Sequence, residues 1–319
     1  MRFVVLGDDE RLGLVEGDRI LDLAKAAKSL KVETGFATLL GLIEAGRKGL
    51  DVARTLAERS RGSDEPGLYT ELSKAPLRAP WPGQRLALAG ANNAKHVANA
   101  FTHLGSPATE QQVYENSRKG PPGAFWAVTR PIMGPGAKIE IPTRALGLFD
   151  YEGEAAFVLG KRGKDIKAKD AKSYVWGVTL VNDWSIREEA WPPKPANALA
   201  LAKNFDCSKS IGPCISVGEA DLDDIRVETF VNGERRQDYT TRDMIFSFAE
   251  VLEYLSQDFT FHPGDVITVG TGAGTIMDMM IPKADGSWPK DQFLKAGDTV
   301  EIRSPVVGSL VGHVVPKSS

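Results

Sequence analysis

Two glutamates and one aspartate are the residues of this sequence whose types and spacing could bind a metal ion. Glu152 and Glu154 lie two positions apart in a strand-forming segment, and side chains at positions i and i+2 of a strand share a face. Asp183 ends a second apolar segment, Val178–Asp183. Buried carboxylates that lie close together repel one another, and a bound cation relieves that cost. Hard oxygen ligands of this kind select Mg²⁺, Mn²⁺ or Ca²⁺ over zinc.

Each segment taken alone is equally compatible with an ordinary structural role. Two glutamates on one strand face are common at solvated sheet edges, and the pair Asn182-Asp183 is typical of a turn that ends a strand. The metal site is therefore a hypothesis that requires the three carboxylates to meet in the fold.

Four segments in this order and spacing resemble the fumarylacetoacetate hydrolase family. They are D-Y-E-G-E-A-A-F-V-L-G-K at 150–161, N-D-W-S-I-R at 182–187, A-K-N-F-D at 202–206 with I-G-P at 211–213, and P-G-D-V-I-T-V-G-T at 263–271. The similarity covers roughly Leu86 to Val315, and the N-terminal strands resemble the small leading domain of many members. The resemblance implies a mixed β-roll body, usually a homodimer, with Glu152, Glu154 and Asp183 as ligands of Mg²⁺ or Mn²⁺.

The same resemblance implies three further residues of the active site. Lys203 matches the family's active-site lysine, Arg187 the arginine after the metal-binding aspartate, and Thr271 the threonine of a Gly-Thr loop. A keto acid could chelate the metal, which would stabilise an enolate, and Lys203 and Arg187 would add positive charge there. Without the resemblance, a surface lysine and a salt-bridged arginine are the simpler interpretations.

One motif of the family is altered in this chain. Hydrolytic and decarboxylating relatives commonly carry Asn-Tyr-x-x-His-x-x-Glu, whose histidine and glutamate form an acid–base dyad on a mobile lid. The matching stretch keeps His96 but has Asn93 in place of the tyrosine and Asn99 in place of the glutamate. Asparagine cannot hold a proton or stabilise an imidazolium, which puts the usual water activation in doubt, and Glu110 or Glu115 could substitute. If the protein is a hydrolase, His96 is the expected general base, because it falls where the family's histidine does. The alternative is that His96 is a surface histidine.

A polar, turn-rich stretch follows His96. Residues Phe101–Gly123 include Gly105, Pro107 and the run Lys119-Gly-Pro-Pro-Gly123. This stretch is long for a simple connection, as active-site lids often are. We therefore expect it to form a mobile lid over the metal.

The elements that must position these residues begin with a small α+β domain at residues 1–75. Its predicted strands are Arg2–Leu6, Leu12–Glu16 and Arg19–Leu23, and its predicted amphipathic helices are Phe36–Ala45 and Leu50–Arg59. A polar, turn-rich linker at residues 61–67 closes this part.

Residues 76–319 are expected to form the catalytic domain, which is mainly strands. The hairpin pair Asn232-Gly233 separates Val227–Val231 from Glu234–Gln237, and a capped helix is predicted from Phe248 to Leu255. Further predicted strands are Tyr151–Leu159, Gly177–Val181, Val266–Val269 and Thr299–Ile302. The predicted fold class is α+β, with a mainly mixed β-sheet and a family-type β-roll as the catalytic domain.

The glycine-rich segment Gly270–Gly274 follows a strand, as nucleotide-binding loops do. Residues 275–281 are rich in methionine and run into Pro282, so we expect no amphipathic helix whose N-terminus could bind phosphate. A loop whose backbone approaches a small ligand is the better interpretation.

Composition argues against other classes of protein. Lys and Arg number 39 and Asp and Glu 42, a net charge of −3, and the absence of a basic run argues against nucleic-acid binding. No apolar run has membrane-spanning length, and the N-terminus is typical of a first strand rather than a signal peptide. Only two cysteines occur, Cys207 and Cys214, which favours a reduced, cytoplasmic protein.

The sequence therefore predicts a metal-dependent hydrolase that cleaves a C–C bond in a small 1,3-diketo acid of the fumarylacetoacetate or acylpyruvate type. Alternatives on the same metal site are a dehydratase of a 2-keto-3-deoxy sugar acid and a decarboxylase or isomerase of a 2-keto acid. A non-catalytic ligand-binding relative is the alternative from a different class. The sequence does not name the substrate, because selectivity depends on contacts made by the lid.

Overall fold

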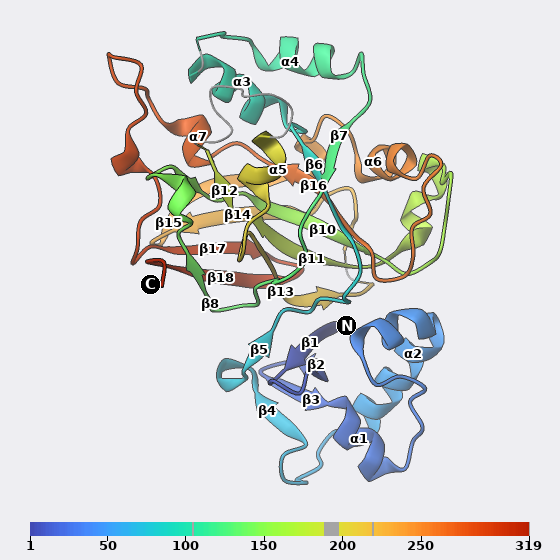
Figure 1. The fold of residues 1–319 in the computed structure, drawn as a ribbon. Helices are drawn as coiled ribbons and strands as arrows, with labels where there is room; N and C mark the ends of the chain where they lie inside the picture. The colour runs from blue at the N-terminus through green and yellow to red at the C-terminus, as the bar shows by residue number, and fades with distance from the viewer. Residues whose placement is uncertain (104, 188–197, 219, 319) are drawn as a thin grey trace.

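The computed structural model describes residues 1–103, 105–187, 198–218 and 220–318. Its N-terminal part, blue in Figure 1, is an antiparallel meander covered by two helices. The strands are β1 (Arg2–Leu6), β2 (Arg11–Glu16), β3 (Arg19–Asp22), β4 (Tyr69–Glu71) and β5 (Leu77–Arg78). The first three match the predicted strands to within one residue at each end.

The helices of this part differ from the prediction. Helix α1 (Leu23–Leu30) was not predicted, and it begins where the Asp22 side chain accepts a hydrogen bond from the Lys25 backbone. The two predicted helices are joined in α2 (Leu39–Ser60), which is kinked at Gly46, where φ is +56°. Glycine adopts this φ without the steric cost that a Cβ would bring, so the chain continues through the kink.

The N-terminal meander is continuous with the central sheet of the body. β1 pairs with β13 (Lys209–Ser216), and one hydrophobic core includes Leu42 of α2 together with Ala156 and Val158 of the body. The division of the chain after residue 75 remains a prediction.

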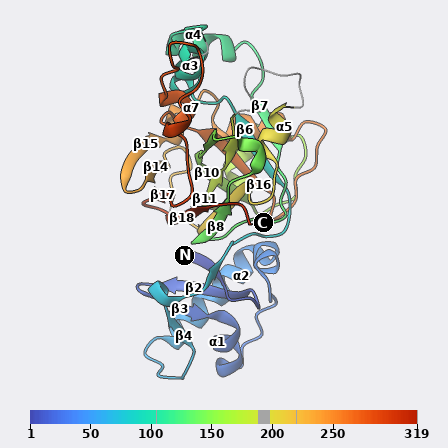
Figure 2. The same cartoon turned by 60° about the vertical axis from the view of Figure 1, so that its left-hand side comes forward.

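Two mixed sheets form the body (Figures 1 and 2). The central sheet continues from β13 through β11 (Val175–Asp183), β10 (Gly153–Leu159), β16 (Val266–Thr271), β6 (Leu86–Gly90) and β7 (Gly123–Trp126). The second sheet has the order β15 (Glu234–Thr240), β14 (Arg226–Val231), β17 (Thr299–Ser304), β18 (Gly308–Val315) and β8 (Ala137–Glu140). Phe157 of β10 and Val227 and Ile302 of the second sheet belong to one buried core, so the sheets pack face to face.

Local signals in the body are confirmed, and some strand ends are corrected. Asn232 and Gly233 have φ values of +51° and +83°, as a two-residue hairpin turn of this type requires. Helix α6 (Phe248–Leu255) begins with the predicted capping box of Ser247 and Glu250. The strand predicted at Tyr151–Leu159 begins only at Gly153, and β11 is longer than the predicted Gly177–Val181.

Four helices lie at the end of the body away from the N-terminal part, in both views (Figures 1 and 2). They are α3 (Ala94–His103), α4 (Glu110–Ser117), α5 (Ala198–Lys203) and α7 (Ile276–Met279). Helix α7 is a single turn within residues 275–281, where the sequence analysis expected no amphipathic helix that could bind phosphate. The remaining elements are β9 (Phe149–Asp150), paired with β12 (Ser185–Ile186), and the 3₁₀ turns η1 (Leu72–Lys74), η2 (Thr143–Ala145), η3 (Ala168–Tyr174), η4 (Thr241–Asp243) and η5 (Lys290–Gln292). Among the described residues, no helix has the length and apolar character needed to cross a membrane.

Candidate active site

The three predicted metal ligands meet in the structure. Glu152, Glu154 and Asp183 are buried, and each offers one carboxylate oxygen within 4.8 Å of the other two. Glu154 lies in β10 and Asp183 ends the adjacent strand β11. Glu152 precedes β10, but its backbone stays beside β11: its N–H donates to Asn182 Oδ1 (3.1 Å) and its carbonyl accepts from Asp183 N–H (2.9 Å). These two bonds keep Glu152 beside β11 although the strand starts one residue later.

Glu154 has an unsatisfied oxygen in this cluster. Its Oε2 is buried and has no hydrogen-bond partner among the described residues. Burial, together with the charges of Asp183 and Glu152, raises the pKa of Glu154 well above its ordinary value. A buried carboxylate oxygen without a donor is costly, and a hard cation would satisfy it.

The charge balance of the site also fits a divalent cation. Five buried carboxylates lie in or next to the cluster, namely Asp150, Glu152, Glu154, Asp183 and Asp278. Three buried cations pair with members of this set, namely Arg187, Lys203 and Lys209. Among the described residues, none of these three cations pairs with Glu154, so a divalent ion would supply the positive charge that this carboxylate lacks.

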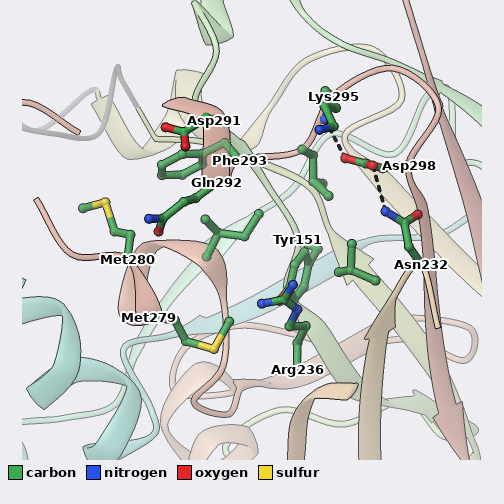
Figure 3. Close-up of a pocket in the computed structure, with 13 residues that line it drawn as sticks. Tyr151, Asn232, Arg236, Met279, Met280, Asp291, Gln292, Phe293, Lys295 and Asp298 are labelled. Carbon is green, nitrogen blue, oxygen red and sulfur yellow. Dashed lines mark hydrogen bonds between the residues drawn. The ribbon is translucent and has the colours of Figure 1, made fainter. Parts of the chain in front are cut away.

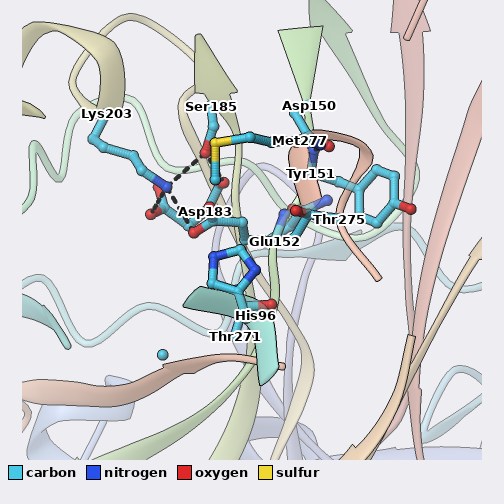
Figure 4. Close-up of polar contacts among 12 residues, drawn as sticks. His96, Asp150, Tyr151, Glu152, Asp183, Ser185, Lys203, Thr271, Thr275 and Met277 are labelled. Carbon is cyan, nitrogen blue, oxygen red and sulfur yellow. Dashed lines mark hydrogen bonds and ion pairs between the residues drawn. The ribbon is translucent and has the colours of Figure 1, made fainter. Parts of the chain in front are cut away.

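Lys203 is placed by the C-terminal end of α5, and its ammonium group points at the acidic cluster (Figure 4). Its Nζ donates to Glu152 Oε2 (2.6 Å), Asp183 Oδ2 (2.8 Å) and Ser185 Oγ (2.6 Å). Burial opposes the charged form, but Asp183 and Glu152 raise the pKa of Lys203 above its ordinary value. All three N–H groups are therefore engaged with the protein, and a contact between Lys203 and substrate remains a prediction.

Arg187 and Thr271 also lie at the site, and both are held by protein partners. The Arg187 guanidinium is 4% exposed and pairs with Asp150 Oδ2 (2.9 Å) and Glu152 Oε1 (2.6 Å). The Thr271 hydroxyl donates to the carbonyl of Gly153 (2.9 Å) and accepts from Gln237 Nε2 (2.8 Å). Arg187 therefore orients the carboxylate of Glu152, and Thr271 joins β16 to the start of β10. Their roles toward a substrate remain predictions.

His96 is a buried histidine rather than a surface one. It lies on α3, and its Nδ1 is 2.8 Å from Oδ2 of Asp278 on α7. Because an ionised carboxylate only accepts hydrogen bonds, this contact places a hydrogen on Nδ1 and leaves Nε2 for proton exchange. Burial raises the pKa of Glu152, but Lys203, Arg187 and His96 outweigh this effect and lower it. His96 therefore lies close to the acidic cluster. Figure 4 shows the imidazole below Glu152 and Asp183 in that view.

Asp278 is the carboxylate that the sequence analysis missed. Glu110 and Asn99 line a separate cavity of about 670 Å³, and Glu115 accepts a hydrogen bond from Gln111 (2.6 Å). A sequence signal was nevertheless present, since Thr275 and Asp278 have the Thr-x-x-Asp spacing of a helix start. In this structure the carboxylate partner of His96 is therefore Asp278, which lies on a different helix from His96.

Lys209 is a second residue that the sequence analysis missed. It lies in β13 behind Asp183, with its Nζ 2.8 Å from Asp183 Oδ1, and it also donates to the carbonyls of Lys203 and Ser208. Burial lowers the pKa of Lys209 despite the opposing charge of Asp183. The side chain thus joins the end of α5 to the end of β11.

A cavity of about 310 Å³ lies next to α7, on its side toward Phe293 (Figure 3). Tyr151, Arg236 and Met279 are among its lining residues, and none of the predicted site residues is. This cavity is therefore separate from the acidic cluster.

Sequence comparison shows the family to which this site belongs. Residues 85–315 match the sequence model described as fumarylacetoacetate (FAA) hydrolase C-terminal. The chain belongs to the fumarylacetoacetate hydrolase family. The family membership and the α+β fold class predicted from the sequence are confirmed.

Relatives within the family have different activities. The chain is 32% identical over 310 residues to the oxaloacetate tautomerase YisK of Bacillus subtilis, which covers 94% of each protein. Its fold is similar to those of a fumarylacetoacetate hydrolase from Exiguobacterium antarcticum (TM-score 0.69) and a 5-carboxymethyl-2-hydroxymuconate delta-isomerase from Mycobacterium smegmatis (TM-score 0.67). Each of these structures is 25% identical to this chain, with 99% of this chain and 100% of the other covered.

The predicted lid contains α4 and the end of α3, and Leu104 within it lies outside the described residues. We expect amide hydrogen exchange in residues 105–123 to slow when Mg²⁺ and oxalate are added together, because a lid that closes over a ligand protects its own backbone. Mass spectrometry of peptides from this range measures the effect, and peptides from Leu50–Ser60 of α2 serve as the remote control. An exchange rate unchanged by the ligands would mean that the stretch is not a lid.

Proposed function

We propose that this protein is a divalent-metal-dependent tautomerase that interconverts the keto and enol forms of a small dicarboxylic 2-keto acid of the oxaloacetate type. The observation that carries the proposal is the buried His96–Asp278 pair next to the acidic cluster. The similarity to an oxaloacetate tautomerase along nearly the whole of both chains supports the reaction type.

Glu152, Glu154 and Asp183 would hold Mg²⁺, Mn²⁺ or Ca²⁺. When bound, the ion would supply positive charge that polarises the 2-keto carbonyl of the substrate. Arg187 donates a hydrogen bond to Oε1 of Glu152, and Lys203 donates one to Oε2. The Glu152 carboxylate therefore has a fixed orientation before an ion binds. A rigid set of ligands favours one coordination geometry.

His96 is the residue that moves the proton. In the keto form, the C3–H bond breaks, its electron pair forms the C2=C3 double bond, and Nε2 of His96 takes the proton. The π electrons of the C2 carbonyl move onto its oxygen, which takes a proton from the His96 imidazolium. This step completes the enol and returns His96 to its neutral form, and the reverse sequence restores the ketone. Asp278 stabilises the imidazolium that forms and holds the ring in one orientation, as a general base requires.

Hydrolysis of a C–C bond in a 1,3-diketo acid is the second candidate. The same His96–Asp278 pair could take a proton from water, and the resulting hydroxide would attack the carbonyl remote from the metal. Tautomerisation needs only the proton transfer, whereas hydrolysis needs a bound water as well. The long similarity to a tautomerase supports tautomerisation as the first candidate.

The test is the decay of freshly dissolved enol-oxaloacetate, followed by its ultraviolet absorbance. We expect the protein with Mg²⁺ to accelerate the decay over buffer with Mg²⁺ alone, and a chelator to remove the acceleration. A parallel panel contains acylpyruvates for hydrolysis and 2-keto-3-deoxy sugar acids for dehydration. Turnover of an acylpyruvate without acceleration of enol decay would overturn the tautomerase in favour of the hydrolase.

A further inference from the structure

We propose that Asp150 is a positioning residue. It would fix the position of the His96–Asp278 pair relative to Glu152, the proposed metal ligand. The connection runs from α7 through the Asp150 carboxylate to Arg187 and from there to Glu152. The kinetic part of this inference rests on the proposed function, whereas its spectroscopic and binding parts do not.

Asp150 is fully buried and uses both carboxylate oxygens. Oδ1 accepts from the backbone N–H groups of Tyr151 (2.8 Å) and Ile276 (3.0 Å). Oδ2 accepts from the backbone N–H of Met277 (3.0 Å) and from Nε of Arg187 (2.9 Å). Four donors fill the acceptor capacity of a carboxylate, so its position is strongly determined.

On one side, Asp150 holds α7. This helix has a single turn, and an isolated turn of helix has no stability of its own. Asp150 binds the first two N–H groups of that turn, and Asp278 follows directly after them. Helix α3 then contacts Asp278 twice: His96 reaches its carboxylate, and a ring nitrogen of His103 lies 2.9 Å from its carbonyl oxygen.

On the other side, Asp150 fixes the metal ligand through Arg187. The guanidinium is planar, and it binds Asp150 through Nε and Glu152 Oε1 through a terminal nitrogen. A rigid fork of this kind transmits the orientation of one carboxylate to the other. Figure 4 shows Asp150 and Met277 next to one another, directly above Glu152 in that view. A displacement of α7 would therefore move Glu152 through two intervening side chains, Asp150 and Arg187.

The competing explanation is that Asp150 only stabilises the fold. Asp265 offers a matched control, because it is also fully buried and bound by an arginine and by backbone N–H groups. It accepts from the backbone N–H and Nε of Arg85 (3.2 and 3.0 Å), from a terminal nitrogen of Arg85 (2.5 Å) and from His262 N–H (2.7 Å). None of these partners contacts the acidic cluster or α7.

The experiment compares Asp150→Asn with Asp265→Asn. Asparagine keeps one acceptor oxygen but loses the charge and replaces the other oxygen with a donor, so both variants should lower the melting temperature. Only Asp150→Asn should shift the histidine ¹⁵N NMR signals of His96 in the metal-free protein and weaken Mn²⁺ binding, the latter by about 10-fold. In the tautomerase assay it should lower kcat with little change in KM, because the proton-transfer pair is displaced, and such a displacement costs up to about 10²-fold.

The outcomes separate the possible explanations. If Asp150→Asn lowers only the melting temperature and leaves the His96 signals and Mn²⁺ affinity as in the parent, Asp150 has a structural role alone and the proposal is wrong. If Asp150→Asn does not fold, Arg187→Lys tests the same connection, because lysine lacks the fork that joins the two carboxylates. If the His96 signals are unchanged in Arg187→Lys as well, the proposed positioning role of Asp150 is wrong. If the parent protein has no tautomerase activity, the proposed function is wrong. The NMR and Mn²⁺-binding measurements would still test the positioning role of Asp150.

Discussion

Replacing Glu154 by glutamine is expected to abolish the thermal stabilisation that Mg²⁺ or Mn²⁺ gives to the parent protein. Glu154 Oε2 and Asp183 Oδ1 are the buried ligand oxygens of the cluster without a hydrogen-bond partner among the described residues. Lys209 Nζ lies 2.8 Å from Asp183 Oδ1, so Glu154 gains most from a cation. At a metal concentration about 100 times Kd, binding to the folded state alone adds about 2.7 kcal/mol to the free energy of unfolding. An amide supplies no charge to a hard-cation site, so this gain should disappear.

The metal-free Glu154→Gln protein should be at least as stable as the metal-free parent. Burial and the charges of Asp183 and Glu152 all disfavour a charge at this position by raising the pKa of Glu154, and glutamine is neutral. Thermal melts with and without metal therefore separate loss of the site from loss of the fold. Asp278→Asn is the matched control, because it changes a buried carboxylate next to the cluster and should retain the metal-dependent shift. Metal binding by Glu154→Gln as tight as in the parent would place the site elsewhere.

Replacing His96 by alanine is expected to lower turnover by roughly 10²–10⁴-fold, the usual contribution of a general base, while metal binding stays intact. The effect arises because Nε2 of His96 is the group that exchanges the proton, and Nδ1 is already committed to Asp278. The measurement is kcat for enol decay, combined with the metal-dependent thermal shift of the same variant. A near-parental rate in His96→Ala would rule out this role.

Two variants test whether Asp278 is the functional partner of His96. Asp278→Asn should also lower turnover, because asparagine offers no charge to an imidazolium. Asn99→Glu, which restores the glutamate of the family motif, should change the rate little, because Asn99 lines a cavity apart from the acidic cluster. If Asn99→Glu raises the rate strongly and Asp278→Asn keeps the parental rate, then Asp278 is not the functional partner of His96.

The sequence by itself determined the features that depend on neighbouring residues. The hairpin at Asn232-Gly233, the capping box of α6 and the first three strands follow from turn residues, caps and hydrophobic spacing within a few positions. Glu152 and Glu154 were correctly expected to point the same way, because an extended chain repeats its side-chain direction every second residue. The order of the four family segments was also sufficient to predict the family.

The tertiary structure alone decided which distant residues meet. His96 and Asp278 are 182 positions apart, and no local pattern pairs a residue of α3 with one of α7. The same holds for Lys209 behind Asp183 and for Asp150 between α7 and Arg187, since each contact depends on which elements the folded chain places next to one another. Local spacing determines the face on which a side chain lies, whereas its partner is fixed by the packing of whole elements. The sequence therefore predicted the three carboxylates that meet in the fold, and only the fold showed the aspartate that pairs with His96.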